Sequence, residues 1–404
     1  MAQHSREDWK LVEFYDSEPL ENVLSLLYGD YSGVTFVYFA NANEPDARGK
    51  ACMEHFVEET CGFLPQFLAI GENSISAALE AFRALIASGG KYDFDITGGS
   101  SVFVAAAGAL LQEDGGRRMA LHEYSMKDGG CVFRTPQETL PPRRKTPIRL
   151  TVAQMLALRD IRVLGGRLQG RKGEEKQQFR QEVFRLWDTV RGENRAWNTL
   201  CTLSPGLIPM EDGAMVEKKM PPHQYEVCRP MLDKLKRAGF LSQLQSRRDG
   251  GSLAVSYRLH LPQQYWGLFE KAGNLLETVT CLAAEQCPGI TDCCTGVEVD
   301  WDSRSVVKFP NPTNEIDVIA AWKHISCFIS CKNTGAENDY LYEIMTMARH
   351  FGGKYALPVL VAATDSNPVL RVRAEESGIL LIDNVGSMTA KEFTERLSQA
   401  FSEI

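Results

Sequence analysis

Two short segments near the end of the chain combine acids with a lysine at strand spacing. Glu315 and Asp317 lie two residues apart, as do Ser330 and Lys332, so each pair shares one face of an extended strand. The 13-residue step from Asp317 to Ser330 leaves room for a turn between neighbouring antiparallel strands. We therefore expect these side chains to gather at one end of a sheet.

Carboxylates and a lysine gathered in this way suit phosphodiester hydrolysis. Carboxylates hold a hard divalent cation such as Mg²⁺ or Mn²⁺. The cation stabilises charge on the phosphate and makes bound water more acidic. Lys332 would orient that water or neutralise the developing charge. The alternative interpretation is an ordinary surface, because acidic strands near a lysine are common there.

The sequence around these residues predicts the elements that position them. Apolar periodicity predicts helices over 263–286, 339–353, 367–378 and 389–401, and strands over 296–303, 305–309, 314–322, 327–333, 356–364 and 379–383. This mixture predicts an α/β domain, which we place at residues 263–404.

These segments resemble the PD-(D/E)xK nuclease superfamily. Its pattern is an Asp on one strand, an acid-x-Lys on the next, and often a Glu on the preceding helix. On this resemblance Asp317, Lys332 and Glu277 are catalytic residues. Ser330 departs from the pattern, because it stands where the family has its second acid. The resemblance then implies a weak metal site formed by Glu277, Asp317 and the backbone carbonyl of Cys331. It also implies that this domain has a restriction-endonuclease-like α/β fold.

Polar residues and glycines follow three strands in the first third of the chain. Strands over 34–40, 67–71 and 92–99 alternate with helices, which predicts a mostly parallel sheet with helices on both faces. The candidate ligand-binding residues after these strands are Asn41, Asn43, Asn73, Thr97, Gly98, Gly99 and Ser100. Ligands of open parallel sheets bind at such carboxyl ends, and helix N-termini attract anions. We expect a nucleotide pocket here, with a set of ordinary turns as the alternative.

Taken together, the two ends of the chain resemble the CARF-domain nucleases of type III CRISPR defence, the Can and Card group. The residues that carry the resemblance are Asp95–Gly99 at the front, and 314–318 and 329–332 at the back. The resemblance implies a Rossmann-like CARF domain and a homodimer activated by a cyclic oligoadenylate, typically cyclic tetra-adenylate. It also implies cleavage of DNA or RNA with Mg²⁺ or Mn²⁺.

The middle of the chain is basic, whereas both ends are acidic. Residues 143–260 carry 23 of the 44 Lys and Arg but only 12 of the 52 Asp and Glu. This balance favours a polyanionic partner, with a solvated helical face as the alternative. A basic helix contains Pro230, and we expect this proline to break or kink the helix. A hairpin carrying Arg247 and Arg248 follows it. That order resembles a winged helix-turn-helix, and a mere spacer is the other interpretation.

We therefore divide the chain into a nucleotide-sensing domain at 1–142, a basic segment at 143–262 and a nuclease domain at 263–404. The charged start, the scattered cysteines and the lack of any apolar run near the roughly 20 residues that span a bilayer predict a cytoplasmic protein without a membrane partner. Two other functions stay open. One is a nucleotide-sensing transcription regulator with a degenerate nuclease domain. The other is a ring nuclease using His55 or His122.

Overall fold

The computed structural model describes residues 8–136, 139, 148–167, 173–202, 206–211, 213–300 and 313–403. Its contacts divide the chain into two compact units, Met1–Arg162 and Val163–Ile404, which we call the first and second units. The predicted boundaries at 142 and 262 give a different division and stay predictions. Within the described ranges, every helix is too short or too polar to cross a membrane.

The first unit is a six-stranded sheet of order β3-β2-β1-β4-β5-β6 covered by helices on both faces. Its strands are β1 Trp9–Phe14, β2 Gly33–Phe39, β3 Gln66–Ile70, β4 Lys91–Asp95, β5 Met119–Ser125 and β6 Gly130–Arg134. Its helices are α1 Glu21–Tyr28, α2 Ala47–Cys61, α3 Ile75–Ala87, α4 Ser101–Asp114 and α5 Val152–Ala157. All pairs are parallel except β5 with β6. The structure thus confirms a mostly parallel α/β sheet of Rossmann-like type.

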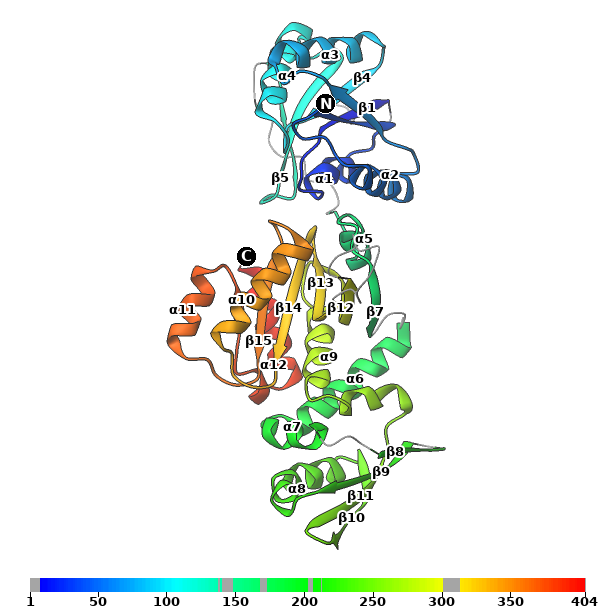
Figure 1. Cartoon of the computed structure of the whole chain (residues 1–404), viewed down its shortest axis with the longest axis vertical. Coiled ribbons are helices and arrows are strands. Elements are labelled where there is room, and N and C mark those ends of the chain that lie inside the picture. Colours follow the sequence, from blue (N-terminus) through cyan, green and yellow to red (C-terminus); the bar gives the residue numbers. More distant parts are fainter. Residues whose placement is uncertain are drawn as a thin grey trace. The chain divides into compact units, whose positions relative to one another are not determined.

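Figure 1 shows α3 and α4 on one side of this sheet and α1 and α2 on the other. The α3–α4 side is aromatic. The ring of Phe14 in the central strand β1 stacks on Phe82 at 5.7 Å and lies 5.2 Å from Phe103. A serine side chain caps the start of each of these two helices. Ser74 accepts a hydrogen bond from the backbone N–H of Ala77, and Ser100 accepts one from the backbone N–H of Val102.

The second unit contains two sheets. The larger has the order β16-β15-β14-β13-β12-β7 and the smaller β10-β11-β9-β8. The strands of the larger sheet are β7 Val163–Arg167, β12 Ile290–Asp300, β13 Thr313–Trp322, β14 Ile325–Lys332, β15 Leu357–Ala362 and β16 Leu380–Ile382. Those of the smaller are β8 Gly206–Met210, β9 Gly213–Met220, β10 Leu241–Asp249 and β11 Ser252–Leu259. Strands β7, β12, β13 and β14 pair antiparallel, and β15 and β16 continue in parallel.

The helices of the second unit tie the basic segment to the last third of the chain. They are α6 Gly173–Val190, α7 Asn194–Thr202, α8 Pro222–Arg237, η1 Gln263–Phe269, α9 Gly273–Ala284, α10 Asn338–Met347, η2 Ala348–Gly352, α11 Pro368–Glu376, η3 Val385–Ser387 and α12 Ala390–Ser402. One apolar core joins Trp187 of α6, Leu232 of α8, Leu276 of α9 and Val318 of β13. This shared core and the pairing of β7 with β12 explain why the contacts divide the chain at 162.

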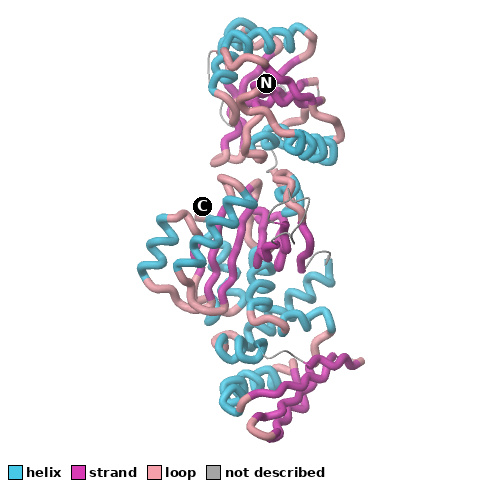
Figure 2. The backbone as a smooth tube through the Cα atoms, viewed as in Figure 1, coloured by secondary structure: helices cyan, strands magenta, loops and turns pink. Residues whose placement is uncertain are grey.

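Several predicted elements differ in detail from the structure. The helix expected over 263–286 is interrupted, because η1 ends at Phe269 and α9 begins at Gly273. Helix α8 continues through Pro230 rather than breaking there. The helix-plus-hairpin of the basic segment is confirmed as α8 followed by the antiparallel pair β10–β11, and Figure 2 shows the hairpin's strands in magenta. The strand expected over 305–309 lies outside the described residues.

Candidate functional site

The predicted acid and lysine meet where strands β13 and β14 stop pairing. The paired residues run from Trp322 with Ile325 to Val318 with Ile329. Beyond that point the side chain of Asp317 links the two strands in place of backbone pairing. Its Oδ2 accepts hydrogen bonds from the backbone N–H of Cys331 at 2.7 Å and from the Ser330 hydroxyl at 3.2 Å. The carboxylate is thereby fixed at the fork between the two strands.

Lys332 ends β14 at this fork. Its Nζ lies 3.7 Å from Glu343 Oε2 and 4.5 Å from the centre of the Tyr340 ring, both on α10. The lysine side chain is 21% exposed, so its charge reaches solvent. Burial raises the pKa of Asp317, and the Cys331 N–H, Lys332 and Ser330 oppose that rise. Asp317 is therefore a shielded carboxylate whose nearby charges come from Lys332 and Glu343.

Glu277 approaches the same fork from helix α9. Its side chain is 8% exposed, and a Cβ on Gly273 would come within 2.6 Å of its Oε1, so the glycine leaves room for the carboxylate. One turn further on, Thr280 Oγ1 lies 3.6 Å from the Cys331 thiol. Burial and the charge of Asp317 raise the pKa of that thiol well above its usual value, and Glu277 adds to the rise. Glu277 and Asp317 thus both act on Cys331.

Glu315 forms contacts away from the fork, and its predicted catalytic role stays a prediction. It is exposed and forms an ion pair with Lys271 at 3.0 Å, just ahead of α9. Across the sheet it faces Glu298 of β12. Asp317 is the acid of β13 that contacts β14, and Glu315 fastens β13 to the segment before α9.

The oxygen atoms at the fork could serve as ligands of a divalent cation, but only two of these ligand groups are charged carboxylates. Glu277 and Asp317 supply carboxylate oxygens and Cys331 a backbone carbonyl, which are hard ligands of the kind that Mg²⁺ and Mn²⁺ prefer. Among the described residues, no group of three or more His, Cys, Asp or Glu side chains is placed to hold a metal ion. Ser330 occupies the position of a further acid, so the residues fit a metal weakly rather than tightly.

In the first unit, the predicted glycine turn follows β4 and is pinned by its neighbours. Asp95 Oδ1 accepts both the backbone N–H of Thr97 at 2.8 Å and the Thr97 hydroxyl. The Thr97 oxygen in turn accepts the backbone N–H of Tyr124 at 2.6 Å. Gly99 has φ +79°, and a Cβ there would lie 2.5 Å from the Cβ of Phe14. Only glycine fits this close approach to β1.

An acidic segment that the sequence did not predict as part of this site lies beside the glycine turn. Residues 16–22 follow β1, a strand whose short apolar run, interrupted by charge, does not stand out in the sequence. Asp16 Oδ2 accepts the backbone N–H of Gly99 at 3.2 Å, and a Cβ on Gly98 would lie 2.9 Å from Glu21 Oε2. An N–H expected to meet phosphate therefore has a carboxylate partner in this structure.

The asparagines at the other strand ends divide into fixed and exposed ones. Asn43 is fixed, because its Oδ1 accepts the Phe39 N–H at 2.8 Å and its Nδ2 donates to the Tyr15 carbonyl at 3.1 Å. Asn41, which has φ +71°, and Asn73 are exposed after β2 and β3. Because parallel strands end at the same edge, Asn41, Asn73 and the glycine turn lie along one edge of the sheet. Their role in ligand binding stays a prediction.

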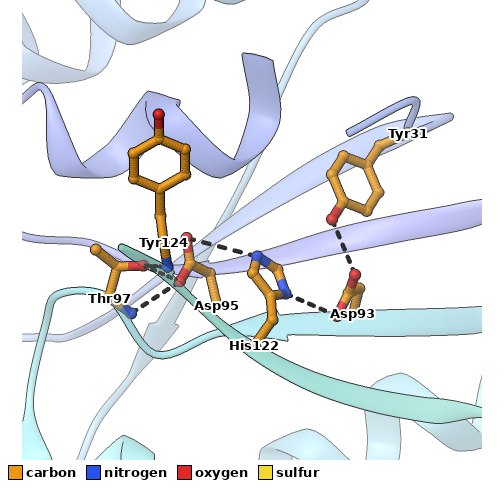
Figure 3. A network of polar contacts seen from close by, with 6 residues as sticks. All are labelled: Tyr31, Asp93, Asp95, Thr97, His122 and Tyr124. Atoms are coloured by element: carbon orange, nitrogen blue, oxygen red, sulfur yellow. Dashed lines mark hydrogen bonds and ion pairs between the residues drawn. The ribbon is translucent and has the colours of Figure 1, made fainter. Parts of the chain in front are cut away.

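A buried polar network underlies the glycine turn (Figure 3). His122 Nδ1 lies 2.8 Å from Asp93 Oδ1, and its Nε2 lies 3.9 Å from Asp95 Oδ2. The Tyr31 hydroxyl donates to the other oxygen of Asp93 at 2.9 Å. Although burial lowers the pKa of His122, Tyr31 and Asp95 raise it to about 10. His122 is therefore a buried cation that holds the acids of β4 together.

Glu13 completes this network from the neighbouring strand. It faces Asp95 across the β1–β4 pair and is fully buried. Burial and Asp95 raise the pKa of the Glu13 carboxyl well above its usual value. The histidines of the ring-nuclease alternative do not meet here. His122 is enclosed, whereas His55 is 76% exposed on α2, with Nε2 3.7 Å from Glu59.

The whole chain shares its fold with two solved proteins. The sequence itself matches no protein-family model and no curated protein. The structure is similar to protein VC1899 from Vibrio cholerae, with a TM-score of 0.68 and 16% identity over 97% of this chain and 98% of that one. It is also similar to Can2 from Sulfobacillus thermosulfidooxidans in complex with cyclic tetra-adenylate, with a TM-score of 0.60 and 14% identity over the same shares.

Proposed function

We propose that this protein is a metal-dependent endonuclease that cleaves DNA, RNA or both when a cyclic oligoadenylate binds its first unit, and that it acts in antiviral CRISPR defence. The observation that carries the proposal is the fork of β13 and β14. There Asp317 and Lys332 on neighbouring strands and Glu277 on α9 surround Cys331, whose N–H holds the Asp317 carboxylate.

Each residue at the fork has a role in such a reaction. Glu277, Asp317 and the Cys331 carbonyl would hold Mg²⁺ or Mn²⁺. When bound, the cation would stabilise charge on the phosphate and acidify a water. Lys332, kept in place by Glu343 and Tyr340, would direct the attacking water and neutralise the charge that develops on the phosphate.

The glycine turn of the first unit supports a sensor for a cyclic oligoadenylate. Cyclic tetra-adenylate has two-fold symmetry, so two copies of the chain would each hold half of it in a homodimer. Thr97, Gly98, Gly99 and Ser100 lie just before helix α4, where a phosphate would have to displace Asp16 from the Gly99 N–H, while Asn41 and Asn73 would reach adenine or ribose. The likeness of fold to Can2, a structure that contains cyclic tetra-adenylate, favours this ligand.

Plasmid DNA and single-stranded RNA, incubated separately with the full chain, test the proposal. We expect strand cleavage when both Mn²⁺ and cyclic tetra-adenylate are present, and none when either is omitted or EDTA is added. Linear tetra-adenylate is the matched control for the ligand, because it carries the same bases without the closed ring. Cleavage that is equal with and without the cyclic ligand would contradict the gating.

The basic hairpin favours one other function, a nucleotide-sensing transcription regulator. Arg247 and Arg248 lie exposed on β10, next to the turn into β11. A regulator of this kind would bind DNA without cutting it, and the double change of both arginines to Ala would reduce the slope of log affinity against log salt by about 2. If wild type cleaves in the presence of metal and Asp317→Asn does not, the result favours the nuclease over the regulator.

A further inference from the structure

One carboxylate links the glycine turn to the acidic segment, residues 16–22. Asp16 Oδ2 accepts the backbone N–H of Gly99 at 3.2 Å, while Oδ1 accepts that of Glu18 at 2.8 Å. The Asp16 backbone is held separately, because the Asn22 side chain bonds to its N–H and to its carbonyl, each at 2.8 Å. Since both oxygens belong to one planar group, a phosphate that displaces Oδ2 from Gly99 also disturbs the bond to Glu18.

Glu18 passes this link to a residue 141 positions further along the chain. Its side chain is 8% exposed and forms an ion pair with Arg159, whose side chain is 18% exposed. A buried charge that loses its partner is strongly destabilising, so the two side chains move as a pair. A shift of Glu18 is therefore transmitted to Arg159.

Arg159 lies in the segment by which the chain leaves the first unit. This exit segment, residues 158–162, follows helix α5 and contains Asp160 in the left-handed region, with φ +54°. A second ion pair holds it, because Arg48 on α2 binds the Asp160 carboxylate. Val163, the first residue of β7, comes four positions after Arg159. Of the two ion pairs that fix the exit segment, the one through Glu18 leads back to the glycine turn.

Strand β7 belongs to the sheet of the second unit that carries the fork. Thr295 of β12 pairs with Arg167 of β7 on one side and with Val318 of β13 on the other. The Thr295 hydroxyl also donates to the backbone carbonyl of Asp317 at 2.9 Å. A change in how β7 lies against Thr295 is therefore one residue away from the acid of the fork.

We propose that Asp16 is an internal competitor for the ligand phosphate, and that its displacement signals to the fork through Glu18, Arg159 and β7. In the resting protein Asp16 occupies the Gly99 N–H, and the Glu18–Arg159 pair fixes the exit segment. A phosphate on Gly99 frees the carboxylate, moves that pair and changes how β7 lies against Thr295. The ligand favours this arrangement because it binds more tightly where Asp16 has left. The inference rests on the proposed function, which brings a phosphate to the turn and the reaction to the fork.

Arg159→Gln tests the link in the full chain. We measure binding of cyclic tetra-adenylate by calorimetry, and cleavage of plasmid DNA and single-stranded RNA with Mn²⁺ at saturating ligand. The variant should bind the ligand at least as tightly as wild type, yet its cleavage should fall about tenfold or more, within the usual size of allosteric coupling. The double variant Glu18→Gln with Arg159→Gln should behave alike, and it leaves neither charge buried alone. Arg83→Gln, which removes an exposed ion pair with Glu113, is the matched control and should keep full stimulation.

Asp16→Asn tests the competitor. The neutral amide competes less for the Gly99 N–H and no longer repels the phosphates, so ligand affinity should rise about tenfold, in line with the strength of a hydrogen bond to a charged group. The ligand concentration for half-maximal cleavage should fall by the same factor. Affinity that is unchanged or lower in Asp16→Asn would overturn the competition.

Hydrogen exchange of wild type reports on the link even if a variant fails to fold. The N–H groups of residues 159–161 bond to carbonyls at the end of α5. Saturating cyclic tetra-adenylate should speed exchange in peptides covering Glu18 and the exit segment, and linear tetra-adenylate should not. Unchanged exchange of the exit segment with ligand bound would overturn the link, as would full stimulation of cleavage in Arg159→Gln.

The link and the proposed function fail separately in these measurements. Ligand binding that changes exchange in the exit segment without any cleavage rejects only the nuclease. Ligand-stimulated cleavage without that change in exchange rejects only the link. Absence of ligand binding by wild type rejects the sensor, and the link with it.

Discussion

Asp95 in the first unit and Asp317 in the second are both strand acids close to a turn or fork, yet their surroundings differ. Asp95 is fully buried, holds Thr97 and lies beside the enclosed cation His122. Asp317 is only partly buried, and the charge that acts on it most strongly belongs to Lys332, whose side chain is partly exposed. The comparison teaches that similar strand acids differ by their surroundings, because Asp95 is enclosed with a buried histidine while Asp317 lies beside a lysine that is partly exposed.

The largest effect should follow from neutralising the open fork. Asp317→Asn and Lys332→Ala should each reduce the cleavage rate by about 10²–10³-fold, the usual cost of removing one group that stabilises charge in the transition state. Binding of cyclic tetra-adenylate, measured by calorimetry, should be unchanged. Lys391→Ala, which removes an exposed lysine of α12, is the matched control. Full activity in either fork variant would reject the assignment of the fork as the reaction site.

The next largest effect should come from the glycine turn. Gly98→Glu adds a negative side chain beside Glu21 and Asp16, because the Cβ itself would lie 2.9 Å from Glu21 Oε2. We expect ligand affinity to fall by roughly 100-fold or more, as like charges repel both each other and the phosphates. Cleavage would be lost through lack of activation, although the fork is intact. Tight calorimetric binding by this variant would remove the turn from the binding site.

A smaller change should show whether the fork lacks one acid. Ser330→Asp places a second carboxylate within reach of Asp317, whose Oδ2 is 3.2 Å from the present hydroxyl. Without metal the two carboxylates would repel, and a cation would relieve that repulsion. The Mn²⁺ concentration for half-maximal cleavage should fall roughly tenfold, equivalent to about 1.4 kcal/mol. Ser330→Ala is the neutral control, and an increased Mn²⁺ requirement in Ser330→Asp would show that Ser330 has another role.

The smallest effect should be a pH dependence of the buried network. Glu13 and His122 have pKa values raised above the ordinary 4.5 and 6.5, the latter to about 10. Both groups keep protons in the folded state that the unfolded chain has already released. Stability of the first unit should therefore decrease as pH rises from about 5 to about 10.

Glu13→Gln should remove part of this decrease, because the amide cannot ionise. At pH 8 the variant should unfold a few degrees higher, since each kcal/mol changes the midpoint by about 2–4 °C in a domain of this size. Hydrogen exchange of peptides covering β1 and β4, compared at the same pH, assigns the change to the first unit. Glu58→Gln, an exposed change on α2, should leave protection unchanged. Lower protection in Glu13→Gln would contradict the buried proton.

The sequence predicts the parts of this fold whose periodicity and spacing are regular. The strand that ends in Lys332 and the turn at Thr97–Ser100 were both located from short motifs, because strand alternation and glycine turns are local properties. Three features depend on distant contacts and were missed. They are β1 with its buried Glu13, the pairing of β7 with β12, and the ion pair that engages Glu315. A glutamate in a strand is expected at the surface until the contacts that bury it are known.

The dependence of cleavage on ligand occupancy tests the central claim most directly. Cyclic tetra-adenylate is titrated into wild type at fixed Mn²⁺, and ligand binding and cleavage rate are recorded on the same samples. We predict that both saturate together at one ligand for two chains, because the ligand activates only by binding the active arrangement more tightly. Cleavage already maximal without ligand, or complete occupancy without cleavage, would contradict a nuclease gated by its first unit.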